Sequence, residues 1–414
     1  MAILWSPAPS SPSPAVRILF LSQRVPYPPN RGDKIITWRL VERFAREHEV
    51  TIACFSHDEA DEEAARFLRD EKGIKTITVP IDLRRKKLQS LPLLLTDKAL
   101  TLGVFGSKEL QRVVDQELPG SDMAYAFSSS MAAFILGRGT PWILHIAELD
   151  SDKWRQYAER HRFPMSALYR REWKTLRRFE EQAVADAVTN VFCTPLEEVI
   201  FQKELPGYPS MVVRNGVAVD HYTPEPEHAE PGHLVFTGVM DYFPNVDGCI
   251  WFAKEILPMI RERVPGAHFT IVGSKPTPEV QALASLDGVE VTGYVDDTRD
   301  YLKRAAVSVA PLRVARGIQN KVLEALAMGL PTVGTTSATQ GVEGSPGSDY
   351  IVSDDPAEFA EHVVRLLEDP AGARAMGDRA RAFVEDKYRW ENSLAPLDGV
   401  LATIAADANR TTDS

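Results

Sequence analysis

The sequence alternates short apolar runs with stretches of helical spacing, and it does so twice. In the first half, residues 16–22 (VRILFLS) and 50–55 (VTIACF) are apolar runs rich in branched residues, which is typical of buried parallel strands. Between them, residues 34–48 carry apolar side chains at helical spacing. A strand, a loop, a helix and a second strand in this order predict a doubly wound α/β sheet.

The same order restarts after a proline-rich stretch, residues 206–231. Strands are predicted at 233–237, 268–272, 289–292 and 306–310, and amphipathic helices at 248–263 and 319–328. A strand at 187–193 leads into a capping box at Thr194, with proline next and glutamate at the third helical position. Because 414 residues exceed one ordinary core, we expect two Rossmann-like domains facing an interdomain cleft.

Composition and missing motifs exclude several classes of function. The formal net charge of −11 does not favour nucleic acid as a partner. The cysteines Cys54, Cys193 and Cys249 are far apart, which indicates buried thiols rather than disulfides or a zinc site. No apolar run approaches a membrane span and no signal peptide is evident, so we expect a cytoplasmic protein. P-loop, GxGxxG, HExxH and GxSxG motifs are absent.

The loops that follow the strands of the second half are the expected ligand site. Ligands bind at the carboxyl ends of the strands in such sheets, and small residues there permit close approach. The most informative of these loops opens residues 311–334 (PLRVARGIQNKVLEALAMGLPTVG), where a helix start offers an anion site. Lys321 and Glu324 share a face of that helix. They suit a nucleotide diphosphate and its ribose, although a simple surface ion pair is the alternative.

This segment resembles the donor-binding signature of family 4 glycosyltransferases, which have the GT-B fold. Further segments that resemble the family are 17–34, 147–154, 214–222 (RNGVAVDHY), 236–248 and 291–297. Together they resemble the subgroup associated with exopolysaccharide and exosortase (PEP-CTERM) loci, over about residues 15–403. The resemblance implies a hexosyltransferase-type enzyme that moves a sugar, with retention, from a UDP- or GDP-linked donor to a glycan or lipid-linked acceptor, and no protein-bound metal.

Composition, the strand pattern and the resemblance together divide the chain and give the expected donor contacts. We expect a disordered tail (1–14), an acceptor-side domain (15–205), a donor domain (206–385), a helix crossing back to the first domain (386–403) and a flexible tail (404–414). The expected donor-binding residues are Gly32, Gly238, Gly273, Tyr294, Val295, Gly317, Ile318, Lys321 and Glu324.

The chain departs from the family pattern at two places. Arg316 stands eight positions before Glu324, where the family has its first glutamate, and residues 240–247 lack the family's basic pair. We expect Arg316 to face the diphosphate or an acidic sugar, because a guanidinium binds anions through two parallel hydrogen bonds. An arginine stacked on the rim of the site is the alternative. With Lys321, it would replace the missing basic pair.

The first half supplies candidates for the acceptor side. The run at 142–150 begins as a strand and ends in carboxylates, so His145 and Asp150 are expected to be catalytic and Glu148 to contact the acceptor. A histidine in an apolar strand is more often structural, and that alternative stays open. Arg31, beside Gly32 in the loop at 26–33, is also placed on the acceptor side. An ordinary turn before a helix is the competing interpretation of this loop.

Two basic stretches, 84–95 (RRKKLQSLPLLL) and 155–178, mix cations with apolar residues. They indicate either peripheral contact with an anionic membrane surface or solvated helix faces. Two other functions also remain open: a nucleotide-sugar epimerase of the same architecture, and a non-catalytic partner in a polysaccharide assembly complex.

Overall fold

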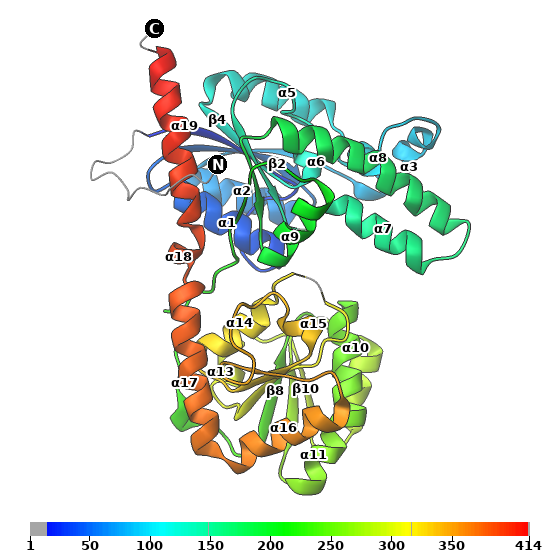
Figure 1. The fold of residues 1–414 in the computed structure, drawn as a ribbon, viewed down its shortest axis with the longest axis vertical. Coiled ribbons are helices and arrows are strands. Elements are labelled where there is room, and N and C mark those ends of the chain that lie inside the picture. The colour runs from blue at the N-terminus through cyan, green and yellow to red at the C-terminus, as the bar shows by residue number, and fades with distance from the viewer. Residues whose placement is uncertain (1–14, 148, 316, 413–414) are drawn as a thin grey trace. The chain divides into compact units, whose positions relative to one another are not determined.

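The computed structural model describes residues 15–147, 149–315 and 317–412, with side chains as far as residue 407. The chain divides into two compact units, each built around its own sheet (Figure 1). Unit 1 runs to Arg214 and takes up the chain again from Leu394, and unit 2 is Asn215–Ser393. The tail expected at 1–14 lies outside the described residues.

Unit 1 contains a seven-stranded parallel sheet in the order β3-β2-β1-β4-β5-β6-β7. Its strands are β1 (Arg17–Ser22), β2 (Glu49–Ser56), β3 (Lys75–Pro80), β4 (Met123–Phe127), β5 (Trp142–Ile146), β6 (Thr189–Phe192) and β7 (Ser210–Val212). Its helices are α1 (Gly32–Phe44), α2 (Glu59–Asp70), α3 (Leu83–Ser90), η1 (Leu91–Leu95), α4 (Leu100–Phe105), α5 (Lys108–Glu117), η2 (Leu118–Gly120), α6 (Ser129–Ala132), α7 (Asp150–Arg160), α8 (Met165–Asp186), α9 (Pro195–Glu204) and α19 (Pro396–Thr412).

Unit 2 contains a six-stranded parallel sheet in the order β10-β9-β8-β11-β12-β13. Its strands are β8 (His233–Thr237), β9 (His268–Val272), β10 (Val289–Gly293), β11 (Val307–Ala310), β12 (Thr332–Gly334) and β13 (Ile351–Val352). Its helices are η3 (Pro226–His228), α10 (Phe243–Trp251), η4 (Phe252–Ile256), α11 (Leu257–Arg263), α12 (Pro278–Gln281), η5 (Ala282–Ser285), α13 (Arg299–Leu302), α14 (Asn320–Ala327), α15 (Thr336–Thr339), α16 (Pro356–Glu368) and α17 (Pro370–Lys387); α18 (Trp390–Leu394) ends at the boundary with unit 1.

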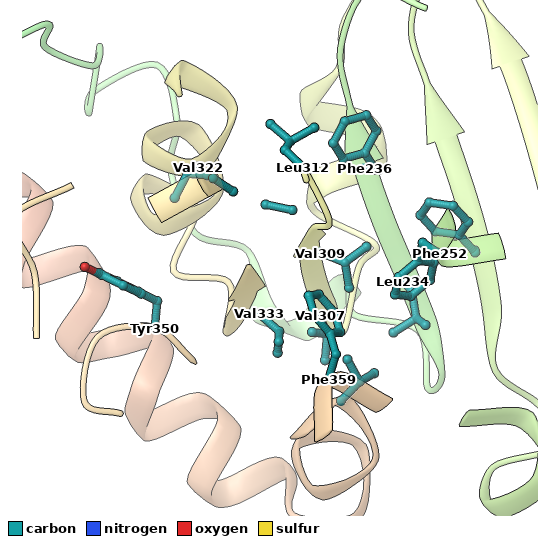
Figure 2. Close-up of a cluster of buried hydrophobic side chains, with 14 of the residues drawn as sticks. Leu234, Phe236, Phe252, Val307, Val309, Leu312, Val322, Val333, Tyr350 and Phe359 are labelled. Carbon is teal, nitrogen blue, oxygen red and sulfur yellow. The ribbon is translucent and has the colours of Figure 1, made fainter. Parts of the chain in front are cut away.

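The central strands of unit 2, β8, β9 and β11, are almost entirely buried because both faces of the sheet are covered. On β8, Leu234 and Phe236 belong to one buried cluster, while Val235 between them belongs to another. Figure 2 shows part of the first cluster, where Val322 of α14 faces the β11 side of the core and Leu312. A continuous apolar run is the pattern of a strand buried on both sides. The predicted strands at 233–237 and 268–272 are confirmed to the residue.

Helix α14 is fixed in place at its end as well as on its inner face. The amide of Leu330 bonds the carbonyl of Ala325 beyond Gly329, which adopts a φ of 66°. This left-handed glycine ends the helix, as the sequence predicts. Arg381 of α17 donates to the carbonyls of Ala327 and Tyr222, and so ties the helix end to its neighbours. These bonds fix the C-terminal end of α14 to the neighbouring elements of unit 2.

The helix predicted over 248–263 is confirmed, although it contains a π-helical turn. The structure places a π-helical turn, η4, between α10 and α11, and the amide of Leu257 bonds the carbonyl of Phe252. Pro258 is the physical reason, because a proline lacks an amide hydrogen and its ring clashes with the carbonyl four residues earlier. A turn with bonds five residues apart relieves that clash.

Two local predictions about unit 1 can be compared with the structure. The capping box is confirmed, because the Thr194 side chain accepts from the Glu197 amide and Pro195 opens α9. The last helix continues to Thr412, where the sequence predicts a flexible tail from residue 404. This helix belongs to unit 1, and its Asp398 accepts a hydrogen bond from Arg43 of α1 at 2.7 Å.

The ends of β8 and β9 approach each other so closely that glycine is required. Gly273 adopts a φ of 148°, and a Cβ atom there would lie 1.7 Å from the carbonyl oxygen of Gly238. The Gly238 amide bonds the Val272 carbonyl at 2.9 Å, and the Met240 amide bonds the Ser274 carbonyl at 2.8 Å. The backbone segments that follow β8 and β9 are therefore closely packed and hydrogen-bonded to each other at the carboxyl edge of the sheet.

Gly273→Ala is therefore expected to destabilise unit 2 by roughly 2–4 kcal/mol, from backbone strain and the backbone clash together. Calorimetric unfolding of the full chain measures this loss. Gly266→Ala is the matched control, since a Cβ at Gly266 meets no atom within 4 Å. Equal unfolding temperatures for the two variants would contradict the close approach.

Candidate functional site

The candidate site lies at the carboxyl edge of the unit 2 sheet. Because all strands run parallel, the loops after β8, β9 and β11 emerge at this one edge. They carry Gly238, Gly273 and the chain that leads from Leu312 to α14. The structure thus brings several predicted donor-binding residues to the same edge.

Lys321, the second residue of α14, packs against the end of β8. Its Nζ atom lies 4.3 Å from the centre of the Phe236 ring and donates a hydrogen bond to Oδ1 of Asn245. A Cβ atom at Gly238 would lie 2.9 Å from the same Nζ. The ring attracts the ammonium electrostatically, and the missing side chain at Gly238 makes room for it. The ammonium is thereby held in one position.

Asn245 belongs to the candidate site by its contact with Lys321, and the sequence does not predict this contact. Asn245 is 4% exposed in the first turn of α10, and its Nδ2 atom donates to the Val239 carbonyl at 2.8 Å. Because that bond uses the amide nitrogen, the amide oxygen must face Lys321. In the sequence, residues 240–247 are notable only because they lack the family's basic pair. The signal in the sequence that could have identified this residue is an asparagine shortly after the first strand of unit 2.

Electrostatics at this edge favour an anion that carries more than one charge. Burial lowers the pKa of Lys321 to about 8, so the ammonium is charged at neutral pH but poorly solvated. The side chain of Gln319, the N-cap residue of α14, makes no capping hydrogen bond to the first turn of the helix. The unpaired amides of a helix start carry a partial positive charge. An ammonium beside such a helix start suits a diphosphate.

Glu324 lies one turn further along α14, near Lys321. Burial raises its pKa, while the Tyr222 hydroxyl bonds the carboxylate and partly opposes that rise. The segment that contains Tyr222 also brings Asn215 to the first residue of α14, where its Nδ2 atom donates to Asn320 at 3.3 Å. Segment 215–222 therefore contacts α14 at its start and again one turn later. In this structure, the motif at 214–222 serves to hold α14.

The remaining predicted donor contacts in unit 2 differ in exposure. Tyr294 follows β10 and is 75% exposed, whereas Val295 packs against the cluster around Leu302. Ile318, just before α14, packs against the main core of unit 2, and the preceding Gly317 has a φ of 66°. Arg316 lies outside the described residues, so its predicted role stays a prediction.

His145 lies entirely inside unit 1. Its Nδ1 atom is 2.7 Å from the Tyr125 hydroxyl and its Nε2 atom is 3.4 Å from the sulfur of Cys193. Complete burial lowers its pKa to about 3, so the ring is neutral. With both ring nitrogens engaged in the core, this placement favours the structural alternative.

Asp150 occupies a more reactive setting at the carboxyl edge of the unit 1 sheet. It is the first residue of α7, and it accepts a hydrogen bond from Ser129 at the start of α6. Glu180 is fully buried nearby, where its Oε1 atom accepts from the Ser151 amide at 3.2 Å. Burial first, and the Asp150 charge second, raise the pKa of Glu180 to about 8. Glu180 thus carries a proton at neutral pH beside Asp150.

The other predicted residues of unit 1 lie at loop positions. Arg31 directly precedes α1 and pairs with Asp33 at 2.6 Å. Gly32 opens the helix, and a Cβ there would meet no atom within 4 Å. Glu148 lies outside the described residues. Gly32 and Arg31 belong to unit 1, whereas the candidate site lies in unit 2.

Unit 1 also has a pocket of about 690 Å³ between α2 and α3. Its lining mixes the carboxylates of Asp58, Glu59, Glu62 and Asp82 with the cations of Arg66, Arg85 and Lys86. Carboxylates repel a diphosphate, so this pocket suits the donor's leaving group less well than the start of α14.

A group of possible metal ligands lies at the opposite edge of the unit 2 sheet. Glu230, His233 and His268 have ligand atoms within 4.8 Å of one another, and the two histidines begin β8 and β9. Their rings are stacked at 4.7 Å with 8° between the planes. A metal ion lies in the plane of each imidazole that binds it, and two stacked planes do not converge on one ion. We therefore assign no metal to this group.

Residues 231–369 match a family model described as "Glycosyl transferases group 1". The matched residues all lie in unit 2. They include Gly238, Asn245, Lys321 and Glu324. In the described part of the chain, no helix is long and apolar enough to cross a membrane.

Among curated proteins, the chain is similar to the GDP-mannose-dependent alpha-(1-6)-phosphatidylinositol monomannoside mannosyltransferase of Mycobacterium tuberculosis. The two are 32% identical over 156 residues, which cover 34% of this chain and 40% of that protein. The chain spans roughly two fifths of the length of the curated relatives it matches.

Solved structures resemble almost the whole chain. Sucrose-phosphate synthase of Thermosynechococcus elongatus has a TM-score of 0.69 at 17% identity, covering 95% of this chain and all of that one. HepE of Anabaena in complex with UDP also has a TM-score of 0.69, at 13% identity, covering 94% of this chain and all of that one. Two parallel Rossmann-like sheets with helices, matching GT-B structures, confirm the predicted fold class.

Asn245→Asp is expected to raise the pKa of Lys321 above about 8, because a carboxylate replaces the neutral amide beside the ammonium. The pH dependence of acetic anhydride labelling at Lys321, followed by mass spectrometry, measures this change. Gln281→Glu makes the same exchange on exposed α12 and should leave Lys321 unchanged. An unchanged labelling profile in Asn245→Asp would show that the two side chains are not in contact.

Proposed function

We propose that this chain transfers a sugar from a nucleotide diphosphate to an acceptor hydroxyl. The observation that supports this most directly is the ammonium of Lys321, held between Asn245 and the Phe236 ring at the start of α14. It lies within the residues that match the glycosyltransferase model. A half-buried cation beside a helix start is the arrangement that a departing diphosphate needs.

In this proposal the bond between the anomeric carbon and the diphosphate breaks, and a bond to the acceptor oxygen forms. Negative charge develops on the leaving diphosphate, where Lys321 and the first amides of α14 stabilise it. Glu324 accepts hydrogen bonds from the ribose hydroxyls, with Tyr222 orienting the carboxylate. The acceptor's proton passes to a base, for which Asp150 is our candidate. Retention of configuration and no protein-bound metal are part of this proposal.

We also propose the donor and acceptor classes to be tested first. The M. tuberculosis relative is named for GDP-mannose and for a phosphatidylinositol acceptor, and the HepE structure contains UDP. GDP-mannose and UDP-glucose are therefore the first donors to test. From the motifs that resemble the exopolysaccharide and exosortase subgroup, we infer a lipid-linked or polysaccharide-precursor acceptor. Arg316 is proposed to face the diphosphate or an acidic sugar.

A thermal-shift screen against nucleotide diphosphates and their sugars tests the donor, because a ligand that binds only the folded state raises its unfolding temperature. Product analysis then separates the alternatives. An epimerase would convert the donor with no acceptor present, whereas a non-catalytic assembly partner would bind no nucleotide diphosphate at all.

Lys321→Met is expected to lower kcat by about 10²- to 10³-fold, because it removes the cation that faces the leaving group. The same change should raise the unfolding temperature, because the folded state no longer buries a charge whose pKa is lowered. Steady-state rates with the donor found in the screen and thermal unfolding measure the two effects. Lys254→Met, at an exposed position on η4, is the control. Wild-type turnover in Lys321→Met would remove this residue from the mechanism.

The value of kcat/KM should fall as the pH rises through about 8, since the free enzyme then loses the Lys321 proton. Asn245→Asp should move this fall to higher pH. A profile that is the same in wild type and Asn245→Asp would assign the fall to another group.

Glu324→Ala is expected to weaken nucleotide diphosphate binding by about 1.5–3 kcal/mol, through loss of charged hydrogen bonds to the ribose. Isothermal titration calorimetry measures the affinity, and Glu279→Ala on exposed α12 is the control. A 2′,3′-dideoxy nucleotide should lose affinity for wild type but not for Glu324→Ala. If both proteins lose the same affinity for it, the ribose is bound elsewhere.

A further inference from the structure

Unit 1 exposes four leucines along one short segment, the end of α3 and η1. The exposed fractions are 69% for Leu88, 51% for Leu91, 37% for Leu94 and 92% for Leu95. Leucines clustered on a surface in this way mark an interaction site more often than a single exposed leucine does. No described residue of η1 is buried.

Hydrogen bonds from α8 hold this segment, so the exposure is not that of a frayed end. The Arg171 guanidinium donates to the carbonyls of Leu93, Thr96 and Lys98. The neighbouring Glu172 is 2% exposed and accepts from the amides of Leu100 and Thr101, at 2.8 Å each. A buried carboxylate and a shared guanidinium thus fix the backbone on both sides of Thr96.

Leu93 shows which way the segment faces. It turns inward against α4, where a Cβ at Gly103 would lie 2.3 Å from the Leu93 Cδ1 atom. Leu93 therefore anchors η1, while its leucine neighbours stay exposed. The fold uses one leucine of the run for packing and presents the others to solvent.

Cations lie directly beside these leucines. Arg84, Arg85 and Lys87 of α3 are exposed, and among the described residues they form no ion pair. Lys86 differs, because it bonds the Gly106 carbonyl. The whole chain carries a formal net charge of −11, so a run of four cations stands out against an acidic protein. The partner must therefore combine negative charge with an apolar layer.

We propose that this α3–η1 surface, formed by Leu88, Leu91, Leu94, Leu95, Arg84, Arg85 and Lys87, docks on an anionic lipid bilayer. Leucines enter the boundary between headgroups and acyl chains, and the cations face the anionic headgroups. The core of a protein interface is depleted in charged residues, so a second copy of the chain fits this surface less well. Docking would hold the protein where lipid-linked molecules are found.

Flotation of the full chain with vesicles tests the proposal without any nucleotide sugar, so its outcome is independent of the proposed transfer activity. We expect binding to vesicles of phosphatidylcholine with phosphatidylglycerol, and much less binding to phosphatidylcholine alone. Arg84→Gln with Lys87→Gln should weaken binding to the anionic vesicles about 30-fold, at roughly fivefold for each cation. Leu88→Ser with Leu95→Ser should weaken it roughly tenfold or more.

Two control variants make changes of the same chemistry elsewhere in unit 1. Lys108→Gln with Arg112→Gln removes two exposed cations from α5, and Val199→Ser removes an apolar side chain that is 64% exposed on α9. Both should bind anionic vesicles like wild type. Equal binding by all variants, or no binding by wild type, would overturn the proposal. If Leu88→Ser with Leu95→Ser instead dissolves a dimer seen by light scattering, a second copy covers this surface.

Discussion

The contact between the Lys321 ammonium and the end of β8 organises the candidate site. Three groups from different parts of unit 2 define its position: the Phe236 ring, the Asn245 amide oxygen and the backbone at Gly238. Each contact alone is modest, but together they leave one place for the charge. A cation that is already positioned does not need to reorganise as a diphosphate departs, which is the main way that proteins stabilise developing charge. The cost is a lysine with a lowered pKa inside a folded domain.

The fold could be predicted from the sequence because its strands are buried on both faces. The runs at 233–237 (HLVFT) and 268–272 (HFTIV) each contain three apolar residues of five, and a glycine follows each run. Those two signals set the strands and the edge at which ligands bind. The break in the helix at 252–256 was harder to predict. Pro258 was visible in the sequence, but a proline near a helix start is also compatible with an ordinary first turn.

The candidate site could be predicted only in part. Lys321 and Glu324 were found because helical spacing places them on one face and the motif points to a donor. Asn245 was missed because its role depends on the bond to the Val239 carbonyl, which turns its oxygen toward Lys321. Similarly, the Glu180 carboxyl beside Asp150 becomes visible only when α8 packs against the start of α7. Tertiary contacts of this kind leave no periodic signal in a sequence.

The π turn at η4 has a further consequence for unit 2. One additional residue in a helical turn rotates everything that follows by about 100° relative to a regular helix. The first half of the helix, which carries Asn245, is therefore out of phase with the second half, which buries Leu257 and Ile260. The π turn thus allows one continuous helical segment to place the Asn245 amide beside Lys321 and to bury Leu257 and Ile260 in the core.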